Sequence, residues 1–446
     1  MVLHRQSQSS GQAGKALDTG LAVCLCLLLA FGCLAFGAVE EWGKFILELG
    51  AALLFIIWAA SRIALPRLEI SFNPLLVPAS ILAAIVALQL LLGRTAYWYA
   101  TWHKALLWTT YGILLFLGSQ LFRRRETRLW FAAACSVFGF LVAMFAVAQN
   151  FAGNGKYYWV ITNQASTAFF GPYANYSHYA GLMEMLIPFP LLLGMARFYP
   201  IPLRVLFTFA AVIMSSTIFL SQSRGGIVAL AVEIAVLAIL TARGHPARRQ
   251  TLWVGLFCLF VVFCLFLVRP IGLWGRFMQL GDRPNLSHEP NRLTMLKDSV
   301  VMVGRRPLLG WGFGSFPFVY PSFRSFYTDF KVNAAHNDFA ELTVETGLLG
   351  LTAVLAFIYL LYRKALPQVK HWRHDAWDNT ALAALVGCTG LIVHSCSDFN
   401  LQIPANAAIF FTMAAMATAR ALRQKDLARP DLSPMEDEMV MDGAPE

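Results

Sequence analysis

Long uninterrupted apolar runs constrain this chain more than any other feature of its sequence. A helix of about 20 apolar residues crosses the hydrocarbon core of a bilayer, and the sequence contains twelve runs of roughly that length. The runs cover residues 20–39, 45–61, 74–93, 104–122, 129–149, 179–197, 203–221, 225–242, 251–269, 340–362, 380–397 and 404–420. Only 13% of the residues are charged, whereas a soluble domain carries about 25%. We therefore expect an all-α polytopic membrane protein, and neither a soluble enzyme, a disordered chain nor a nucleic-acid binder.

Arginine and lysine gather on every second connection between these runs. The connections rich in them hold Arg62, Arg67, Arg123, Arg124, Arg125, Arg128, Arg197, Arg204, Arg243, Arg248, Arg249, Arg363, Lys364, Lys370 and Arg373. The short connections on the other side hold only Lys44, Arg94, Lys104, Lys156 and Arg224. Because positive residues mark the cytoplasmic side of a membrane protein, we predict that both termini are cytoplasmic.

The runs also divide the chain into parts. We predict a cytoplasmic N-terminus at 1–19, nine spans within 20–269 with an outer loop at 150–178, a large outer loop at 270–339, three spans within 340–420, and a disordered cytoplasmic tail at 421–446. Only the two outer loops are long enough to build a site beyond the membrane, so we expect the chemistry on the outer face.

Arg224 stands in the segment Ser221-Gln-Ser-Arg-Gly-Gly226, at the outer end of the eighth run. A helix macrodipole disfavours a cation at the helix N-terminus, and the short outer connections are otherwise poor in positive residues. These two penalties indicate a compensating anion, either a buried carboxylate or a phosphate. The alternative is an interfacial arginine whose head group snorkels to lipid headgroups.

The large outer loop is basic, and its arginines include Arg283 and Arg292. Arginine binds phosphate oxygens through a bidentate fork, so a group of arginines at the membrane surface is suited to an anion. A solvated surface explains the same charges, and the sequence gives the two interpretations equal weight.

His336 opens the tenth run, with Asn337 in the N-cap position. A helix N-terminus disfavours the protonated form of a histidine, and a neutral imidazole can accept a proton as a general base. Behind it, Asp338, Glu341 and Glu345 share one helical face. These carboxylates could orient the base, pair with Arg224 or hold a loop arginine. The alternative is a polar cap at a helix entrance.

Three weaker segments complete the candidates. Leu309-Gly-Trp-Gly-Phe-Gly-Ser-Phe316 has neither the strand nor the lysine of a nucleotide-binding loop, so we predict a tight turn that approaches a partner closely. The segments 172–178, with Asn175 and His178, and 394–400 could line the same outer cavity or be hydrogen-bonded helix ends. No His, Cys, Asp or Glu cluster on the outer side has metal-ligand spacing, so we predict no metal and no cofactor.

Taken together, these motifs resemble the bacterial O-antigen ligase/polymerase superfamily. The resemblance rests on Ser221–Gly226, on Arg292 followed by Arg306-Pro-Leu-Leu-Gly-Trp-Gly-Phe-Gly-Ser-Phe316, and on His336-Asn337 with Glu345-Thr-Gly347. The segments 174–181 and 394–404 resemble its exopolysaccharide-type members, and the similarity spans about residues 150–420. The chain departs from many relatives in having Tyr176-Ser177 where they carry a second Asn before His178.

The resemblance implies a GT-C type membrane glycosyltransferase in the bacterial inner membrane. Such enzymes move a glycan from undecaprenyl diphosphate, at the periplasmic face, to an acceptor hydroxyl of lipid A core or of another glycan, without a metal. The family's diphosphate-binding arginines match Arg224 and Arg292, with Arg283 close enough to compete for the second assignment, and its histidine matches His336. Asp338, Glu341, Glu345, His178 and Asn175 would support them.

Two alternatives follow from the same residues. A repeat-unit polymerase needs the same donor site as a ligase and differs only in its acceptor, and we place ligase-type transfer slightly ahead. A transporter of lipid-linked glycans or small anions also suits many spans, intramembrane glutamates and a basic outer vestibule. Transporters usually carry internal repeats, and we find none.

Overall fold

Helices make up nearly all the regular structure of this protein. The computed structural model describes residues 2–64, 70–162, 169–242, 292–328 and 331–421. The first helices are α1 (Val2–Leu34), α2 (Glu41–Ala64), α3 (Leu76–Leu91), α4 (Trp98–Leu121), α5 (Arg125–Ala152), α6 (Tyr176–Leu186), α7 (Pro188–Met195), α8 (Ile201–Ser221) and α9 (Arg224–Ala242). They are followed by α12 (Arg292–Arg305), α13 (Phe316–Val319), α14 (Asp338–Ala365), α15 (Ala376–His394) and α16 (Pro404–Thr418). Strands β1 (Lys156–Tyr157) and β2 (Ile161–Thr162) pair antiparallel in one short hairpin.

The predicted all-α membrane architecture is confirmed in its essentials. In the described part of the chain, eight helical segments are long and apolar enough to cross a bilayer. The predicted runs 74–93 and 404–420 form α3 and α16, which are shorter than a full span, and the run 104–122 falls within α4. The run 251–269 lies outside the described residues. The total of twelve spans therefore stays a prediction.

The central helices are packed on all sides, whereas the outer ones keep an apolar face exposed. Helix α15 contacts α6, α9 and α16, and α16 is buried along its whole length. Both are rich in alanine, which lets helix backbones approach closely in a membrane. The outer helices expose large apolar side chains such as Ile63, Leu91 and Trp130, as expected of a lipid-facing surface.

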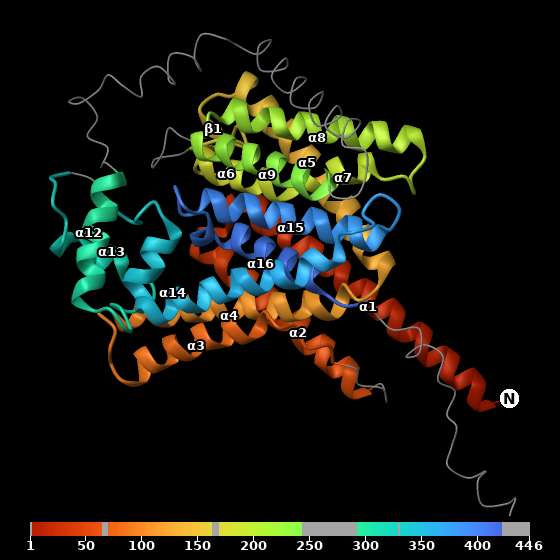
Figure 1. The fold of residues 1–446 in the computed structure, drawn as a ribbon, viewed down its shortest axis with the longest axis horizontal. Helices are drawn as coiled ribbons and strands as arrows, with labels where there is room; N and C mark the ends of the chain where they lie inside the picture. The colour runs from red at the N-terminus through yellow and green to blue at the C-terminus, as the bar shows by residue number, and fades with distance from the viewer. Residues whose placement is uncertain (1, 65–69, 163–168, 243–291, 329–330, 422–446) are drawn as a thin grey trace, which may run out of the picture.

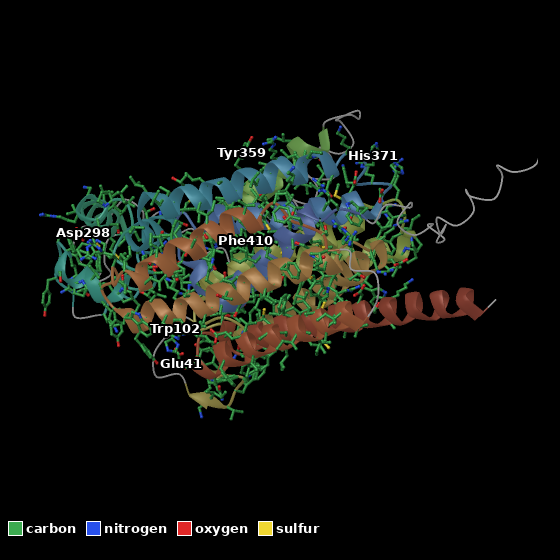
Figure 2. The ribbon with its side chains drawn as sticks, turned by 90° about the horizontal axis from the view of Figure 1, so that it is seen from below. Glu41, Trp102, Asp298, Tyr359, His371 and Phe410 are labelled. Carbon is green, nitrogen blue, oxygen red and sulfur yellow. The ribbon has the colours of Figure 1, made fainter. Side chains whose placement is uncertain are left out.

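The connections predicted to be outer meet at one end of the helix bundle. Helices α12 and α13 lie at that end, beside the start of α14 (Figure 1). The connection between α3 and α4 joins them, because the amide of Ala96 donates to the carbonyl of Trp311 over 2.7 Å. Asp298 marks this end, His371 the opposite end, and Phe410 the middle of the bundle (Figure 2). We call the end with α12 and α13 the loop end.

Several arginines predicted to be cytoplasmic meet away from the loop end. Arg62 and Arg124 both pair with Asp18 of α1, and the amide of Arg197 donates to the carbonyl of Arg373, close to His371, over 2.7 Å. This separation of the two sets of connections agrees with the charge pattern in the sequence.

The glycine-rich segment 309–316 is the predicted tight turn. Gly310, Gly312 and Gly314 all have positive φ, a conformation that glycine adopts without strain. The amides of Trp311 and Gly312 donate to the carbonyls of Val344 and Glu345, each over 3.0 Å. The turn therefore fastens the outer segment to α14 and fixes the entrance of that helix.

Candidate functional site

The residues that join α15 to α16 form the centre of the candidate site. We call residues Ser395–Asp398 the hub turn. Its backbone bonds the start of α14, since the amide of Asp338 donates to the carbonyl of Ser395 over 3.0 Å and the side chain of Asn337 donates to the carbonyl of Cys396 over 2.8 Å. Asn337 also caps α14 as predicted, accepting from the amide of Ala340 over 2.9 Å. The hub turn therefore holds the helix entrance that carries His336.

His336 lies directly against this turn. Its Nδ1 lies 3.3 Å from Oδ1 of Asp398, and its side chain is 31% exposed while that of Asp398 is 3% exposed. His336 has a positive φ of 50°, which is uncommon outside glycine, asparagine and aspartate. A carboxylate at Nδ1 orients the ring and leaves Nε2 to act on a substrate.

Asp398 is held in its charged form. Burial would raise the pKa of this carboxyl, but the hydrogen bond with His336 and the nearby charge of Arg292 hold the pKa well below its usual range. The amide of Phe399 donates to Oδ1 over 2.9 Å as well. Asp398 is therefore a negative charge beside the imidazole at neutral pH.

Arg292 is the first residue of α12 and reaches the same turn. Its Nη1 donates to the carbonyl of Ser397 over 2.5 Å, and its Nη2 lies 4.0 Å from Oδ2 of Asp398. The side chain remains 54% exposed. The guanidinium is thus anchored at one edge and still open to an anion on the other.

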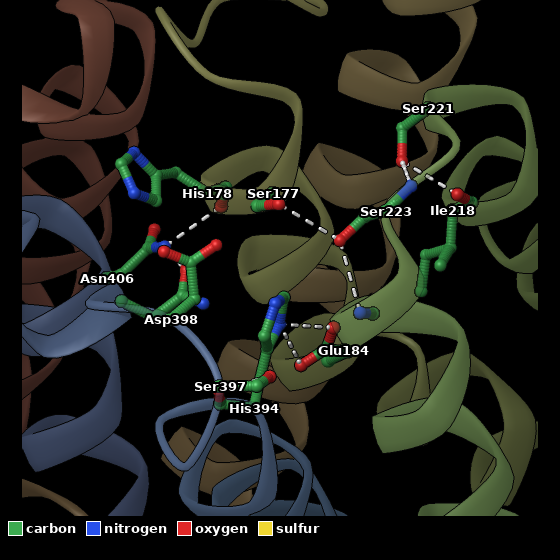
Figure 3. A network of polar contacts seen from close by, with 12 residues as sticks. Ser177, His178, Glu184, Ile218, Ser221, Ser223, His394, Ser397, Asp398 and Asn406 are labelled. Atoms are coloured by element: carbon green, nitrogen blue, oxygen red, sulfur yellow. Dashed lines mark hydrogen bonds and ion pairs between the residues drawn. The ribbon is translucent and has the colours of Figure 1, made fainter. Parts of the chain in front are cut away.

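Arg224 is the first residue of α9, and its side chain is exposed. The preceding Ser223 caps this helix, because its Oγ accepts from the amide of Gly226 over 3.1 Å and lies 3.2 Å from Oγ of Ser177 (Figure 3). A Cβ built on Gly225 would lie 3.0 Å from Oγ of Ser397. The backbone next to Arg224 therefore touches the residue that binds Arg292.

A second histidine–carboxylate pair lies beneath the hub turn. Nδ1 of His394 lies 2.9 Å and 3.2 Å from the two carboxylate oxygens of Glu184 (Figure 3), and both side chains are fully buried. They belong to α15 and α6. This pair has no exposed surface from which to reach a substrate.

The three acidic residues of α14 have partners of their own. Lys104 of α4 lies 3.1 Å from Oε2 of Glu345 and 3.7 Å from Oε1 of Glu341. Asp338 accepts from the amide of Leu401 over 2.9 Å. Glu341 and Glu345 also accept backbone amides, from Ala335 over 2.9 Å and from Phe316 over 3.2 Å. These carboxylates hold the outer segment on α14, and the carboxylate bonded to His336 is that of Asp398 instead.

Asn175 and His178 lie at the start of α6. Asn175 caps that helix by accepting from the amide of Ser177 over 2.8 Å. The rings of His178 and His336 both pack edge-to-face on Phe399, with centroids 4.6 Å and 4.9 Å from it. His178 is almost fully buried, and its Nε2 has no hydrogen-bond partner among the described residues. Arg283 lies outside those residues.

An apolar pocket leads from this site into the bundle. It lies between α3, α4, α14 and α16, with Trp108, Phe357 and Phe411 among its lining residues. Its polar lining groups include Lys104 and Asp338, and Leu401 and Gln402 also border it. Asp338 is two residues from His336, so the pocket lies beside the entrance of α14.

The structure brings three predicted residues together and adds others that the sequence did not single out. Arg292 and His336 contact the hub turn, and Gly225, the residue after Arg224, lies against Ser397 of that turn. Asp398 and Lys104 were overlooked as partners, although the segment 394–400 stood out as polar and Lys104 as a rare outer lysine. His394 opens the same segment 394–400, whereas Glu184 stands in the sequence only as an isolated carboxylate within an apolar run. In the part of the chain that the structure describes, no group of three His, Cys, Asp or Glu residues could hold a metal ion.

A comparison with models of known protein families identifies one stretch of the chain. The family model for O-antigen ligases matches residues 209–355. This stretch contains Arg224, Arg292 and His336, whereas Glu184, His394 and Asp398 lie outside it. No match is found among curated proteins.

Proposed function

We propose that this chain, in which residues 209–355 match the family model for O-antigen ligases, transfers a glycan from undecaprenyl diphosphate to a hydroxyl of lipid A core. The transfer takes place at the periplasmic face of the inner membrane, uses no metal and inverts the anomeric carbon. The family supports a membrane glycosyltransferase of the ligase or polymerase type. The donor, the acceptor and the roles of individual residues belong to the proposal.

The observation that carries it is the convergence on the hub turn. His336 lies 3.3 Å from Asp398, Arg292 bonds Ser397, and Gly225 beside Arg224 packs on Ser397. These residues come from four separate parts of the chain. A base, an anchored guanidinium and a second arginine next to the same turn are what transfer from a lipid diphosphate requires.

His336 acts as the general base. As the acceptor oxygen attacks the anomeric carbon, Nε2 of His336 removes the hydroxyl proton, and the bond from the anomeric carbon to the diphosphate oxygen breaks. The electron pair of that bond leaves with undecaprenyl diphosphate. Asp398 orients the ring and stabilises the imidazolium that forms, and general-base catalysis of this kind contributes about 10²–10⁴-fold to a rate.

Arg224 and Arg292 bind the diphosphate. The leaving group gains negative charge as the bond breaks, and guanidinium groups that are already in place stabilise that charge without reorganisation. Arg292 keeps half of its side chain exposed while its other edge is anchored, so it can bind an anion with little loss of side-chain freedom. Arg224 is exposed at the start of α9.

The apolar pocket is suited to the polyprenyl chain. Aromatic and aliphatic side chains line it, and Asp338 and Gln402 border it near the hub turn. A lipid diphosphate bound there would have its first isoprene units between the helices and its diphosphate beside the arginines. The burial of apolar chain would contribute about 0.8 kcal/mol per CH₂ group.

The test uses purified protein in detergent with a synthetic undecaprenyl-diphosphate glycan and lipid A core. We expect a glycan–core product and free undecaprenyl diphosphate from the wild type, and a rate lower by about 10²–10⁴-fold from His336→Asn at equal protein concentration. Transport has no meaning in detergent, so a wild type that makes no product with any acceptor would favour the transporter alternative.

The acceptor is tested in a deletion strain. Long polymer that remains on undecaprenyl diphosphate, together with bare lipid A core, is expected for a ligase. Single repeats on the carrier with no long polymer would identify a polymerase and overturn the ligase assignment. Unchanged glycan in both fractions would overturn glycan transfer altogether.

A further inference from the structure

The buried pair of Glu184 and His394 is not used in the proposed reaction, and its placement calls for a physical reason. Both side chains are fully buried, on α6 and α15. Taking ionisable groups out of water costs several kcal/mol each, and a well-packed apolar pair of the same volume is often at least as stable. Polar groups of this kind within a membrane protein usually have a function.

The pair packs against the start of α9. A Cβ built on Gly225 would lie 2.5 Å from Nε2 of His394, and one built on Gly226 would lie 3.1 Å from Oε1 of Glu184. A Cβ at Gly226 would also approach Cβ of Ala180 to 2.7 Å. Only glycine fits at both positions, so the two glycines after Arg224 let this helix start rest on the pair.

We propose that Glu184 and His394 are positioning residues that hold the first turn of α9, and with it Arg224, against the hub turn. The inference rests on the proposed function, because it gives Arg224 its role at the diphosphate. Glu184 binds Nδ1 of His394 with both oxygens and so fixes the plane of the ring. The opposite edge of that ring is the surface on which the backbone of Gly225 lies.

Loss of the contact between Glu184 and His394 should disturb the two arginines, Arg224 and Arg292, more than the general base His336. Gly225 touches both His394 and Oγ of Ser397, and Ser397 accepts the hydrogen bond from Arg292. His336 is held separately, through Asp398 and through the bonds of Asn337 and Asp338 with the hub turn. Loosening the ring of His394 should therefore weaken donor binding and leave the chemical step nearly unchanged.

Glu233 provides a matched control. It is as buried as Glu184, it lies on α9 itself, and it packs against Gly390 of α15, one turn before His394. Neither of its carboxylate oxygens has a hydrogen-bond partner among the described residues. Glu233→Gln and Glu184→Gln are thus the same chemical change at equal depth, but only the second alters the bond to His394.

The first experiment compares these two variants in the detergent assay. We expect Glu184→Gln to raise KM for the lipid-diphosphate donor by about tenfold with kcat changed less than twofold, the size of effect expected from weakening one hydrogen bond to a charged group. Glu233→Gln should leave both parameters as in the wild type. Equal KM values for the two variants, or a loss confined to kcat, would overturn the inference.

A second set of variants tests the contact with Gly225 directly. Gly225→Ala places a methyl group against the ring of His394 and should raise the donor KM in the wild-type background. In a His394→Ala background the closest contact is removed and only Oγ of Ser397 remains near, at 3.0 Å, so the same substitution should change KM less. Additive effects of the two substitutions on donor KM would overturn the inference. This double-mutant cycle also tests the inference if the Glu184→Gln variant fails to fold. A wild type that makes no product would count against the proposed function, whereas an active wild type with additive effects would count against the positioning role alone.

Discussion

Two histidine–carboxylate pairs share one short connection in this protein, and they differ mainly in exposure. His336 and Asp398 are 3.3 Å apart, with the imidazole 31% exposed. His394 and Glu184 are 2.9 Å apart and fully buried. An imidazole beside a carboxylate can act as a base only where a substrate can reach the ring. In the buried pair, the same two groups can only fix the position of neighbouring atoms.

The hub turn and the last residue of α15 before it contribute a different member to each pair. Asp398 supplies the carboxylate of the exposed pair, and His394, four residues earlier, supplies the imidazole of the buried pair. A displacement of the whole hub turn would disturb both pairs, whereas a change in the His394 ring alone acts on Gly225 and Arg224. This coupling explains how a site built from distant parts of the chain can be held by one connection of a few residues.

Replacing His336 should have the largest effect. His336→Asn removes the base but suits the positive φ at this position, because asparagine adopts that conformation more readily than most residues. We expect kcat to fall by about 10²–10⁴-fold, with donor affinity close to that of the wild type. Single-turnover rates and a separate donor-binding measurement distinguish these two quantities.

The same substitution in the buried pair tests whether the two histidines have different roles. His394→Asn should act on donor KM, with kcat largely retained. If His394→Asn abolished turnover and His336→Asn did not, the roles assigned to the two pairs would be reversed.

Replacing Asp398 should have a smaller effect, and one that depends on pH. The pKa of this carboxyl is held below its usual range, so the charge is present above about pH 4 and is lost only as the pH falls through the lowered value. Asp398→Asn removes a charge that favours the protonated imidazole. We expect kcat at neutral pH to fall by roughly 10-fold or more.

The pH profile provides the check. Since the Asp398 charge persists down to its lowered pKa, the ratio of wild-type to Asp398→Asn kcat should be largest at neutral pH and should shrink only as the pH falls below about 4. A ratio close to one at neutral pH would show that Asp398 does not act through His336.

The sequence predicted the helical membrane architecture and three of the residues that meet at the hub turn. Apolar runs determine helices in a bilayer almost by themselves, since every backbone group there must bond within the chain. Arg224, Arg292 and His336 stood out because charged or ionisable groups are conspicuous near such runs. Their partners were harder to predict, because contact between α4 and α14, or between residues 336 and 398, depends on how helices pack.

The acidic face of α14 illustrates this limit. The spacing of Asp338, Glu341 and Glu345 predicted one polar face, and the structure places them so. The sequence left open whether that face serves the base, Arg224 or a loop arginine. Lys104 approaches Glu341 and Glu345 because α3, α4 and α14 pack side by side, which no periodicity within one segment can reveal.

Arg292 lies beside the exposed His336–Asp398 pair, and its replacement should have a moderate effect on donor binding. Arg292→Lys keeps the positive charge but loses the planar fork, so one compact ammonium replaces the two separate guanidinium edges that face Ser397 and the phosphate. We expect donor KM to rise by about tenfold, which corresponds to ~1.4 kcal/mol. The double variant Arg292→Lys/Glu184→Gln should raise donor KM by less than the product of the two single effects, since both substitutions act through Ser397. Fully additive changes in binding free energy would show that the two substitutions act independently.

Removal of metal ions is expected to have no effect on activity. Treatment with a chelator, followed by assay in metal-free buffer, should leave kcat and KM within error of the untreated protein, because the guanidinium groups of Arg224 and Arg292 supply the charge that a divalent cation would otherwise provide. Each histidine–carboxylate pair brings two potential ligands to one point, whereas a protein metal site commonly uses three or more. A complete loss of activity that is restored by added metal would show that one of the pairs binds a metal together with a further ligand. The exposed pair, His336–Asp398, would be the first to test by substitution.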